Sequence, residues 1–458
     1  MGRDSLVLVM LLLLFFSFFI KKNLFIKNKF FIINFLGIFI LYIIYYLYKY
    51  LKVFTFIYFN IYILVPKFFF FNITILFIAI YFGVLIFFIS DTKLNKKKYF
   101  NILFLLFLFF ISFIYVYTDN FILFFFIYEL FLLPSVFLVY YLSPNKRSLV
   151  ATFYFLIWTQ LGSFLVFIGV VLILINTNSW HFSFISKAYL SNSVKYYIVY
   201  FLFFGFGIKI PIWPFHYWLT KTHVEAPTFF SIYLSGFLVK IALYGFYKFY
   251  IEINFLNNLF FFYWILIIGI FDASLKFWGQ VDLKKLVAYG TIQEMNLIFL
   301  GLLWGTHKLT IFTNFFCITH ALLSTIFFLL IDVLYKRFNT RSIYSISGII
   351  LTYPLMSLTL IFSCINYNGF PFTLKFFVEI YLFFFLIDNN LFLFLMLIFI
   401  LNWLGTISFT YLWFRTLFGI NIASYKQNSI DLTKKELNIF LITFFFFYQL
   451  MYFTLYLI

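Results

Sequence analysis

Apolar runs long enough to cross a lipid bilayer recur from one end of this 458-residue chain to the other. Backbone N–H and C=O groups in hydrocarbon must be hydrogen-bonded within their own segment, so each run is predicted to be a helix. Charged residues make up only 10% of the chain and hydrophobic residues 65%, whereas a soluble domain carries about 25% charged residues. The charges are too few to cover a soluble globule of this size, so a soluble fold is excluded.

The chain is predicted to be an all-α polytopic membrane protein with about 14 transmembrane helices. The fourteen runs lie near 4–20, 30–50, 68–89, 100–117, 120–142, 149–175, 194–220, 228–250, 257–279, 284–305, 309–335, 345–387, 391–419 and 437–458. The first run is expected to remain as a helix, because no small-residue cleavage site follows it. We expect N-terminal helices in 1–99, five-helix repeats in 100–250 and 257–419, and a C-terminal helix in 437–458.

Basic residues gather in short clusters between the apolar runs, and they account for the net charge of +18. This clustering is typical of loops that follow the positive-inside rule, and no nucleic acid is expected as a partner. When the 32 lysines and arginines are assigned to the two sides of the predicted spans, roughly 21 follow odd-numbered spans and about 8 follow even-numbered ones. This asymmetry predicts an even number of spans, with both termini on the outer side.

The two cysteines, Cys317 and Cys364, lie far apart in the sequence and form no Cys-x-x-Cys motif. This pattern excludes an iron–sulfur or zinc site with cysteine ligands from this chain alone. No cofactor is therefore expected in the chain.

Ionisable side chains inside the predicted spans are the candidate functional residues. A charged group at the centre of a membrane helix costs about 2.5–3.5 kcal/mol to insert, so each one needs a partner or a role. The candidates are Glu129, Lys209, Lys240, Asp272, Glu294, Lys375 and Glu379, with His320 as a titratable neutral group. A histidine can take up and release a proton near neutral pH, although a lone histidine in an apolar helix is commonly only a packed polar residue.

The charged candidates also have structural interpretations. Glu129 and Lys240 can form a buried ion pair that only holds helices together, and Lys209 can extend its ammonium to the membrane surface. Lys375 and Glu379 are four residues apart on one helical face and can neutralise each other.

Helix-breaking residues stand next to charged groups in two predicted spans. Gly205, Gly207, Pro211 and Pro214 surround Lys209 in span seven, whereas Gly369 and Pro371 precede Lys375 and Glu379 in span twelve. Proline removes a backbone donor and clashes with the preceding turn, so broken helices are expected in both spans. Paired discontinuous helices at corresponding positions of two halves are typical of inverted-repeat transporters. The pattern indicates a row of proton-exchanging groups along the membrane.

A long motif surrounds the first of these breaks. It runs through Lys209-Ile-Pro211, Phe215-His216-Tyr-Trp218, His223-Val-Glu225-Ala226-Pro227, Lys240-Ile-Ala-Leu-Tyr244-Gly245 and Asp282-Leu-Lys284-Lys285-Leu-Val-Ala288-Tyr289. Over roughly residues 115–420 the chain resembles the antiporter-like membrane subunits of respiratory complex I, and within them the NADH dehydrogenase subunit 4 group. The N-terminal hundred residues match by hydropathy only.

The resemblance implies a fourteen-helix proton-channel subunit of NADH:ubiquinone oxidoreductase that holds no redox centre. The implied relay consists of Glu129, Lys209, Lys240, Glu294, His320 and Glu379. Glu129 and Lys209 correspond to the family's Glu–Lys pair in spans five and seven, Lys240 to its central lysine and Glu379 to its terminal carboxylate. The implied location is the mitochondrial inner membrane, with both termini on the intermembrane-space side and odd-numbered loops in the matrix. The implied partners are other complex I membrane-arm subunits, including neighbouring antiporter-like ones, and membrane lipids such as cardiolipin.

Two residues depart from the family pattern. Glu294 stands where the family usually has a relay histidine, and Lys375 is unexpected so close to Glu379. The chain stops soon after span fourteen, without the long lateral helix of the largest family member, which favours subunit 4 over subunit 5.

Two other functions remain as alternatives to the subunit of complex I. A stand-alone cation/proton antiporter of the same fold would need no partner proteins. A structural membrane scaffold would use the buried charges only as packing pairs, so their substitution would disturb assembly rather than proton flux.

Overall fold

The computed structural model describes residues 108, 111–112, 114–142, 145–188, 190–253, 259–304, 307–418 and 431–457. The first three predicted spans and most of the fourth lie outside these residues. Within the described residues all regular secondary structure is helical, apart from two isolated bridges, Asn120–His181 and Asp282–Ser342. The all-α prediction is therefore confirmed for this part of the chain.

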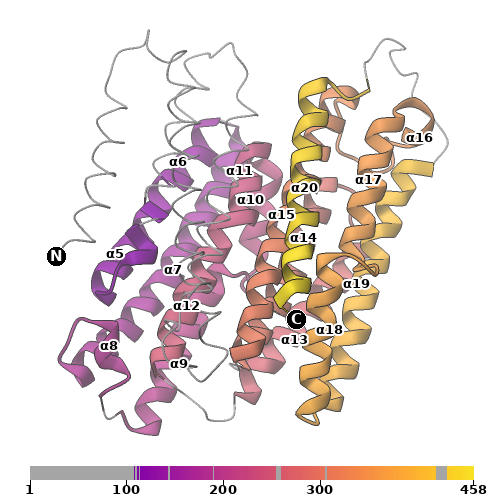
Figure 1. Ribbon diagram of the computed structural model, residues 1–458. Helices are drawn as coiled ribbons and strands as arrows, with labels where there is room; N and C mark the ends of the chain where they lie inside the picture. Colours follow the sequence, from indigo (N-terminus) through magenta and orange to yellow (C-terminus); the bar gives the residue numbers. More distant parts are fainter. Residues whose placement is uncertain are drawn as a thin grey trace, which may run out of the picture. The chain divides into compact units, whose positions relative to one another are not determined.

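The described helices follow one another along the chain (Figure 1). They are α5 (Phe121–Leu130), α6 (Leu132–Leu142), α7 (Lys146–Thr177), α8 (Phe182–Ile185), α9 (Asn192–Lys209), α10 (Tyr217–Glu225), α11 (Thr228–Tyr233), the π-helical segment η2 (Leu234–Leu238), α12 (Val239–Ile253), α13 (Phe260–Trp278), α14 (Leu283–Leu303), α15 (His307–Phe338), α16 (Ile349–Thr352), α17 (Pro354–Tyr367), α18 (Leu374–Asp388), α19 (Phe392–Phe418) and α20 (Lys434–Leu457).

Seven of the described helical segments are long and apolar enough to cross a bilayer. They are Phe121–Tyr140, Lys146–Thr177, Thr228–Ile253, Phe260–Trp278, Leu283–Leu303, Thr313–Phe338 and Phe392–Phe418. The chain is therefore a multi-pass membrane protein. The total of about fourteen spans stays a prediction, because it includes residues outside the described part.

Three helical segments form the enclosed centre of the described residues. In Thr228–Ile253, Leu283–Leu303 and Thr313–Phe338, 94% of the apolar window is buried, against 39% in Lys146–Thr177 and Phe392–Phe418. In Figure 1, α14 and α15 lie between the group α5–α12 and the group α16–α19. The outer helices α7 and α19 expose large apolar side chains, which suits contact with lipid. Charged groups on the three enclosed helices must find their partners within the protein.

Side-chain caps start the helices that carry the three predicted carboxylates. Asn120 precedes α5 and accepts hydrogen bonds from two backbone N–H groups of its first turn. Asp282 accepts from the backbone N–H of Lys284 at the start of α14, at 2.8 Å. Thr373 accepts from the backbone N–H of Phe376 at the start of α18. Because such caps satisfy N–H groups without a helical partner, they set where each helix begins.

Departures from regular α-helix occur beside three of the buried lysines. The helix α9 ends at Lys209, and α10 begins only at Tyr217. The π-helical segment η2 ends two residues before Lys240, and such segments are frequent at functional sites. The helix α17 ends at Tyr367, and α18 begins one residue before Lys375. In each case, backbone outside a regular α-helix lies close to a buried lysine.

Close packing between α7 and α9 leads to a first testable prediction. A Cβ atom added to Gly205 would lie 2.7 Å from the backbone nitrogen of Val166 and 2.9 Å from the carbonyl oxygen of Gly162. Gly205→Ala must therefore push the two helices apart, which typically costs about 1–3 kcal/mol. We expect a lower Tm for the purified variant in mild detergent. Gly279→Ala is the matched control, because its added Cβ would have no neighbour within 4 Å. Equal Tm values for the two variants would contradict the tight α7–α9 contact.

Candidate functional site

Lys240 and His320 are in direct contact at the centre of the described residues. Both side chains are buried, and Lys240 Nζ forms a hydrogen bond with His320 Nδ1 across α12 and α15. Lys240 Nζ also donates to the carbonyl oxygen of Ser235, which lies in the π-helical segment η2. A lysine ammonium has three donors and no acceptor, so a neutral Nδ1 serves as its acceptor here. An amine and an imidazole in contact are a pair between which a proton can be passed.

Lys209 is buried at the end of α9, but it has no ion-pair partner among the described residues. Its Nζ lies 3.5 Å from the centroid of the Tyr128 ring, a position in which the aromatic face attracts the cation. The neighbouring Glu129 is half-buried and accepts a hydrogen bond from Gln160 Nε2 at 3.4 Å. The two predicted partners, Lys209 and Glu129, are not joined by a direct ion pair among the described residues.

A small cavity lies between Lys209 and the helix of Lys240. Tyr128, Ser135 and Lys209 line one side, whereas Leu238 and Ile241 line the other. Its volume is about 10 Å³, and one buried water needs roughly 10–15 Å³. The cavity therefore has room for about a single water between the two lysines' helices.

Glu294, Lys375 and Glu379 form one buried cluster, although they come from different predicted spans. Lys375 Nζ lies 2.6 Å from Glu294 Oε1 and 3.8 Å from Glu379 Oε1. Asn402 Nδ2 donates to Glu379 Oε1 at 3.0 Å. Lys375 Nζ also lies 4.1 Å from the centroid of the Tyr367 ring. The carboxylate nearest to Lys375 is thus that of Glu294 on α14. The contact with Glu379 on the same helix, which the sequence spacing suggests, is the weaker one.

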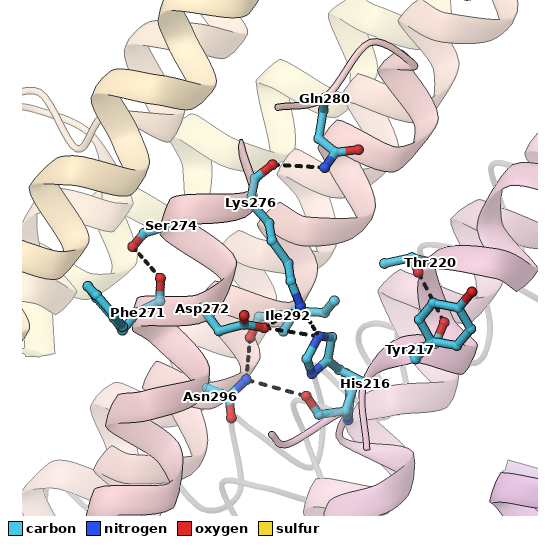
Figure 2. A network of polar contacts seen from close by, with 11 residues as sticks. His216, Tyr217, Thr220, Phe271, Asp272, Ser274, Lys276, Gln280, Ile292 and Asn296 are labelled. Carbon is cyan, nitrogen blue, oxygen red and sulfur yellow. Dashed lines mark hydrogen bonds and ion pairs between the residues drawn. The ribbon is translucent and has the colours of Figure 1, made fainter. Parts of the chain in front are cut away.

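A third charged cluster contains Asp272 (Figure 2). His216 Nε2 lies 3.1 Å from Asp272 Oδ2, and Lys276 Nζ lies 2.7 Å from the same oxygen and 3.1 Å from His216 Nε2. His216 is the last residue of the break between α9 and α10, whereas Asp272 and Lys276 lie on α13. The contacts therefore connect the interrupted segment to α13. Next to them, Asn296 Nδ2 donates to the carbonyl oxygens of Pro211 and Ile292.

Several polar residues of these clusters were not predicted as site residues. His216 and His223 occur in the long motif, which was the signal that could have identified them. His223 is fully buried, stacks on Phe328 with 5.0 Å between ring centroids, and neither ring nitrogen has a partner in the described part. Asn402 is a neutral residue in an apolar helix, and no spacing rule connects it with Glu379.

Comparison with known proteins identifies the family of the chain. The family described as NADH:quinone oxidoreductase/Mrp antiporter transmembrane proteins matches residues 118–405. NADH-ubiquinone oxidoreductase chain 4 of Paramecium tetraurelia is 41% identical over 351 residues, which cover 76% of this chain and 73% of that protein. The chain belongs to this family. The predicted resemblance to the antiporter-like subunits of complex I, and to subunit 4 among them, is thereby confirmed.

Solved structures share the fold at lower identity. A chain of respiratory complex I from Thermus thermophilus with bound NADH is 17% identical, with a TM-score of 0.71, and the match covers 83% of this chain and 79% of that chain. A chain of the Mrp complex from Dietzia sp. DQ12-45-1b is also 17% identical, with a TM-score of 0.75, and the match covers 85% of this chain and 81% of that chain. The family fold is thus an antiporter-like membrane domain.

The cluster at Asp272 leads to a second prediction. Asp272→Asn removes the anion that both Lys276 and His216 contact, and loss of hydrogen bonds to a charged group typically costs about 1–3 kcal/mol. We expect the variant to lose Tm in mild detergent. Lys336→Gln is the control, because it breaks the pair with Asp332 at a lysine side chain that is 60% exposed, and such exposed pairs contribute little. If Asp272→Asn were as stable as Lys336→Gln, the cluster would contribute nothing to the connection between α13 and the interrupted segment.

Proposed function

We propose that this chain carries protons through the membrane arm of NADH:ubiquinone oxidoreductase by a relay of its buried ionisable side chains. As a member of the subunit 4 group, the chain is a proton-translocating membrane-arm subunit. The observation that carries the relay is the contact between Lys240 and His320, enclosed by nearly fully buried helices. Insertion of Lys240 into hydrocarbon is costly, and proton exchange gives the residue a function there.

Further groups of the relay lie on both sides of the contact between Lys240 and His320. On one side, the small cavity beside Lys209 has room for about one water between the α9 break and α12. On the other side, Glu294 and Glu379 form the buried cluster with Lys375. The proposed order of groups is Glu129, Lys209, Lys240, His320, Glu294 and Glu379, so the terminal carboxylate is the last group before the outlet.

The coupling step is assigned to Glu129 and Lys209. Separation of these two groups leaves the ammonium of Lys209 without its anion, which favours release of its proton toward Lys240. The lack of a direct ion pair between them in the described part of the chain suits the separated state. We propose that redox chemistry in other subunits closes and opens this pair. Electron transfer is thus left to those subunits, and this chain supplies the proton path.

The membrane topology belongs to the same proposal. We propose fourteen spans in two five-helix repeats, 100–250 and 257–419, with helices before and after them. The pairs α9/α10 and α17/α18 would be the halves of the discontinuous spans seven and twelve. The distribution of basic residues supports both termini on the intermembrane-space side of the mitochondrial inner membrane. The proposed partners are other membrane-arm subunits and lipids with anionic headgroups such as cardiolipin.

A stand-alone antiporter is the less favoured alternative. The Mrp complex shares the fold at 17% identity, but a likeness of that degree concerns the fold alone. The relative that is 41% identical is a complex I subunit by name.

Substitution of the coupling pair tests the relay. Lys209→Met and Glu129→Gln keep the approximate side-chain volume and remove the charge, so we expect normal assembly of the complex. Proton translocation by the complex in liposomes, driven by NADH, should fall about tenfold or more, the effect of a barrier raised by one or two kcal/mol. Lys221→Met is the matched control, because Lys221 is an exposed lysine on α10. Full translocation by Lys209→Met would contradict the relay.

Isolation in mild detergent separates the two functions. A membrane-arm subunit should co-purify with the other subunits of complex I, because its proton path depends on redox chemistry outside this chain. The measurement is mass spectrometry of the purified complex together with NADH oxidation by the same preparation. A preparation that contains this chain alone and still exchanges cations for protons would support the antiporter instead.

A further inference from the structure

One ammonium group is placed between two buried carboxylates that belong to different helices. Lys375 Nζ lies 2.6 Å from Glu294 Oε1 on α14 and 3.8 Å from Glu379 Oε1 on its own helix. The side chains of Lys375 and Glu294 are 1% and 3% exposed, and that of Glu379 is 14% exposed. Because Lys375 and Glu294 are almost fully buried, water cannot replace either of them as a partner. Lys375 therefore neutralises only one of the two carboxylates well at any time.

The helix itself does not stabilise a cation at this position. Lys375 is the second residue of α18 after the cap Thr373, and the N-terminus of a helix carries partial positive charge. The ammonium therefore depends on a carboxylate for its stability, and it has two within reach. The ring of Tyr367 lies beneath Nζ, with 4.1 Å to its centroid, and gives the cation an attractive surface between them.

The backbone leaves room for the second contact. Gly369, in the break before α18, has a φ of +66°, which favours glycine, and a Cβ added there would lie 3.0 Å from Glu379 Oε2 and 3.8 Å from Lys375 Cγ. The absence of that Cβ leaves space beside both side chains. Asn402 Nδ2 holds the other oxygen of Glu379 at 3.0 Å, so the carboxyl stays in place while the lysine moves.

The two carboxylates occupy different places in the relay. Glu294 lies on the enclosed helix α14, close enough to Lys240 for electrostatic interaction, and Lys375 is similarly close to His320. Glu379 is the more exposed of the two and contacts α19 through Asn402. In the proposed order of groups, a proton that travels from His320 toward Glu379 therefore passes the position of Lys375.

We propose that Lys375 is a positioning residue that moves between Glu294 and Glu379 and thereby controls the last step of proton transfer. In the first state Lys375 pairs with ionised Glu294, and Glu379 holds a proton. When His320 gives a proton to Glu294, the pair is lost and Lys375 moves to Glu379. The ammonium stabilises the Glu379 carboxylate, which releases its proton to the outlet.

The return step completes the balance of protons and charge. The proton on Glu294 passes through water to the Glu379 carboxylate, and Lys375 returns to Glu294. One proton enters from His320 and one leaves at the outlet in each cycle, whereas Lys375 keeps its own proton throughout. In both paired states the three groups together carry no net charge, so neither state leaves an uncompensated charge in the membrane.

This inference rests on the proposed function, but it concerns residues outside the coupling pair. It also explains why Glu294 and Lys375 both depart from the family pattern. Glu294 without Lys375 would be a buried charge that lacks its nearest ammonium, whereas the two together form an ion pair. A permanent structural ion pair would explain the same departure, so the test must separate stability from translocation.

The test uses the intact complex with Glu294→Gln, with Lys375→Gln, and with both substitutions. Glu294→Gln leaves Lys375 without its nearer carboxylate, and Lys375→Gln leaves both carboxylates without an ammonium. We expect each single variant to lower the Tm of the complex. The double variant contains no unpaired charge at Glu294 and Lys375, so we expect its Tm and assembly to recover. Its NADH-driven proton translocation should nevertheless stay about tenfold below that of the unmodified complex, because no ammonium moves to Glu379.

The outcomes distinguish the switch from a structural pair. A double variant that recovers both stability and translocation would overturn the proposal, because Lys375 would then serve only to neutralise Glu294. Lys209→Met is measured in the same liposomes. If Lys209→Met stops translocation and the double variant does not, only the switch fails. If both translocate fully, the relay itself fails and the switch fails with it.

Discussion

Buried ammonium groups in a membrane must find their acceptors within the protein, and this constraint shapes the centre of the structure. Lys240 has His320 and a backbone carbonyl, Lys375 has Glu294, and Lys209 has only the face of Tyr128 among the described residues. These three environments differ in the group that the ammonium contacts: an imidazole, a carboxylate and an aromatic face. A row of unequal sites is what a relay needs, since a proton moves only between groups that can exchange it.

Irregular backbone supplies what regular helices lack. A regular helix uses its own carbonyl groups, so a lysine on it has no backbone acceptor at hand. The π-helical segment η2 presents the Ser235 carbonyl to Lys240, and the break after Lys209 presents the Pro211 carbonyl to Asn296. Such backbone is tolerated at membrane depth only where protein or water surrounds it. The enclosure of α12, α14 and α15 meets this condition.

Much of the fold could be predicted because hydropathy and the hydrogen bonding of backbone groups act within short segments of the chain. The seven apolar helices long enough to cross a bilayer, the family and the ionisable residues on the central helices all follow from residues close in sequence. The pairing of these residues did not follow in the same way. Lys375 was weighed against Glu379, its neighbour on the same helical face, whereas its shorter contact is with Glu294, which is distant in the sequence. Periodicity places a residue on a face but does not identify the helix opposite that face.

The cluster at Asp272 illustrates the same limit. Asp272 stands in the sequence as a charge in an apolar run, yet it contacts both Lys276 on its own helix and His216 from the segment before α10. The sequence by itself determined that the chain lies in a membrane, that it is helical and that it contains costly ionisable groups, because hydrophobicity is a property of each segment alone. Only the tertiary structure decided which carboxylate each lysine meets, because helix packing brings together side chains that no spacing along the chain connects.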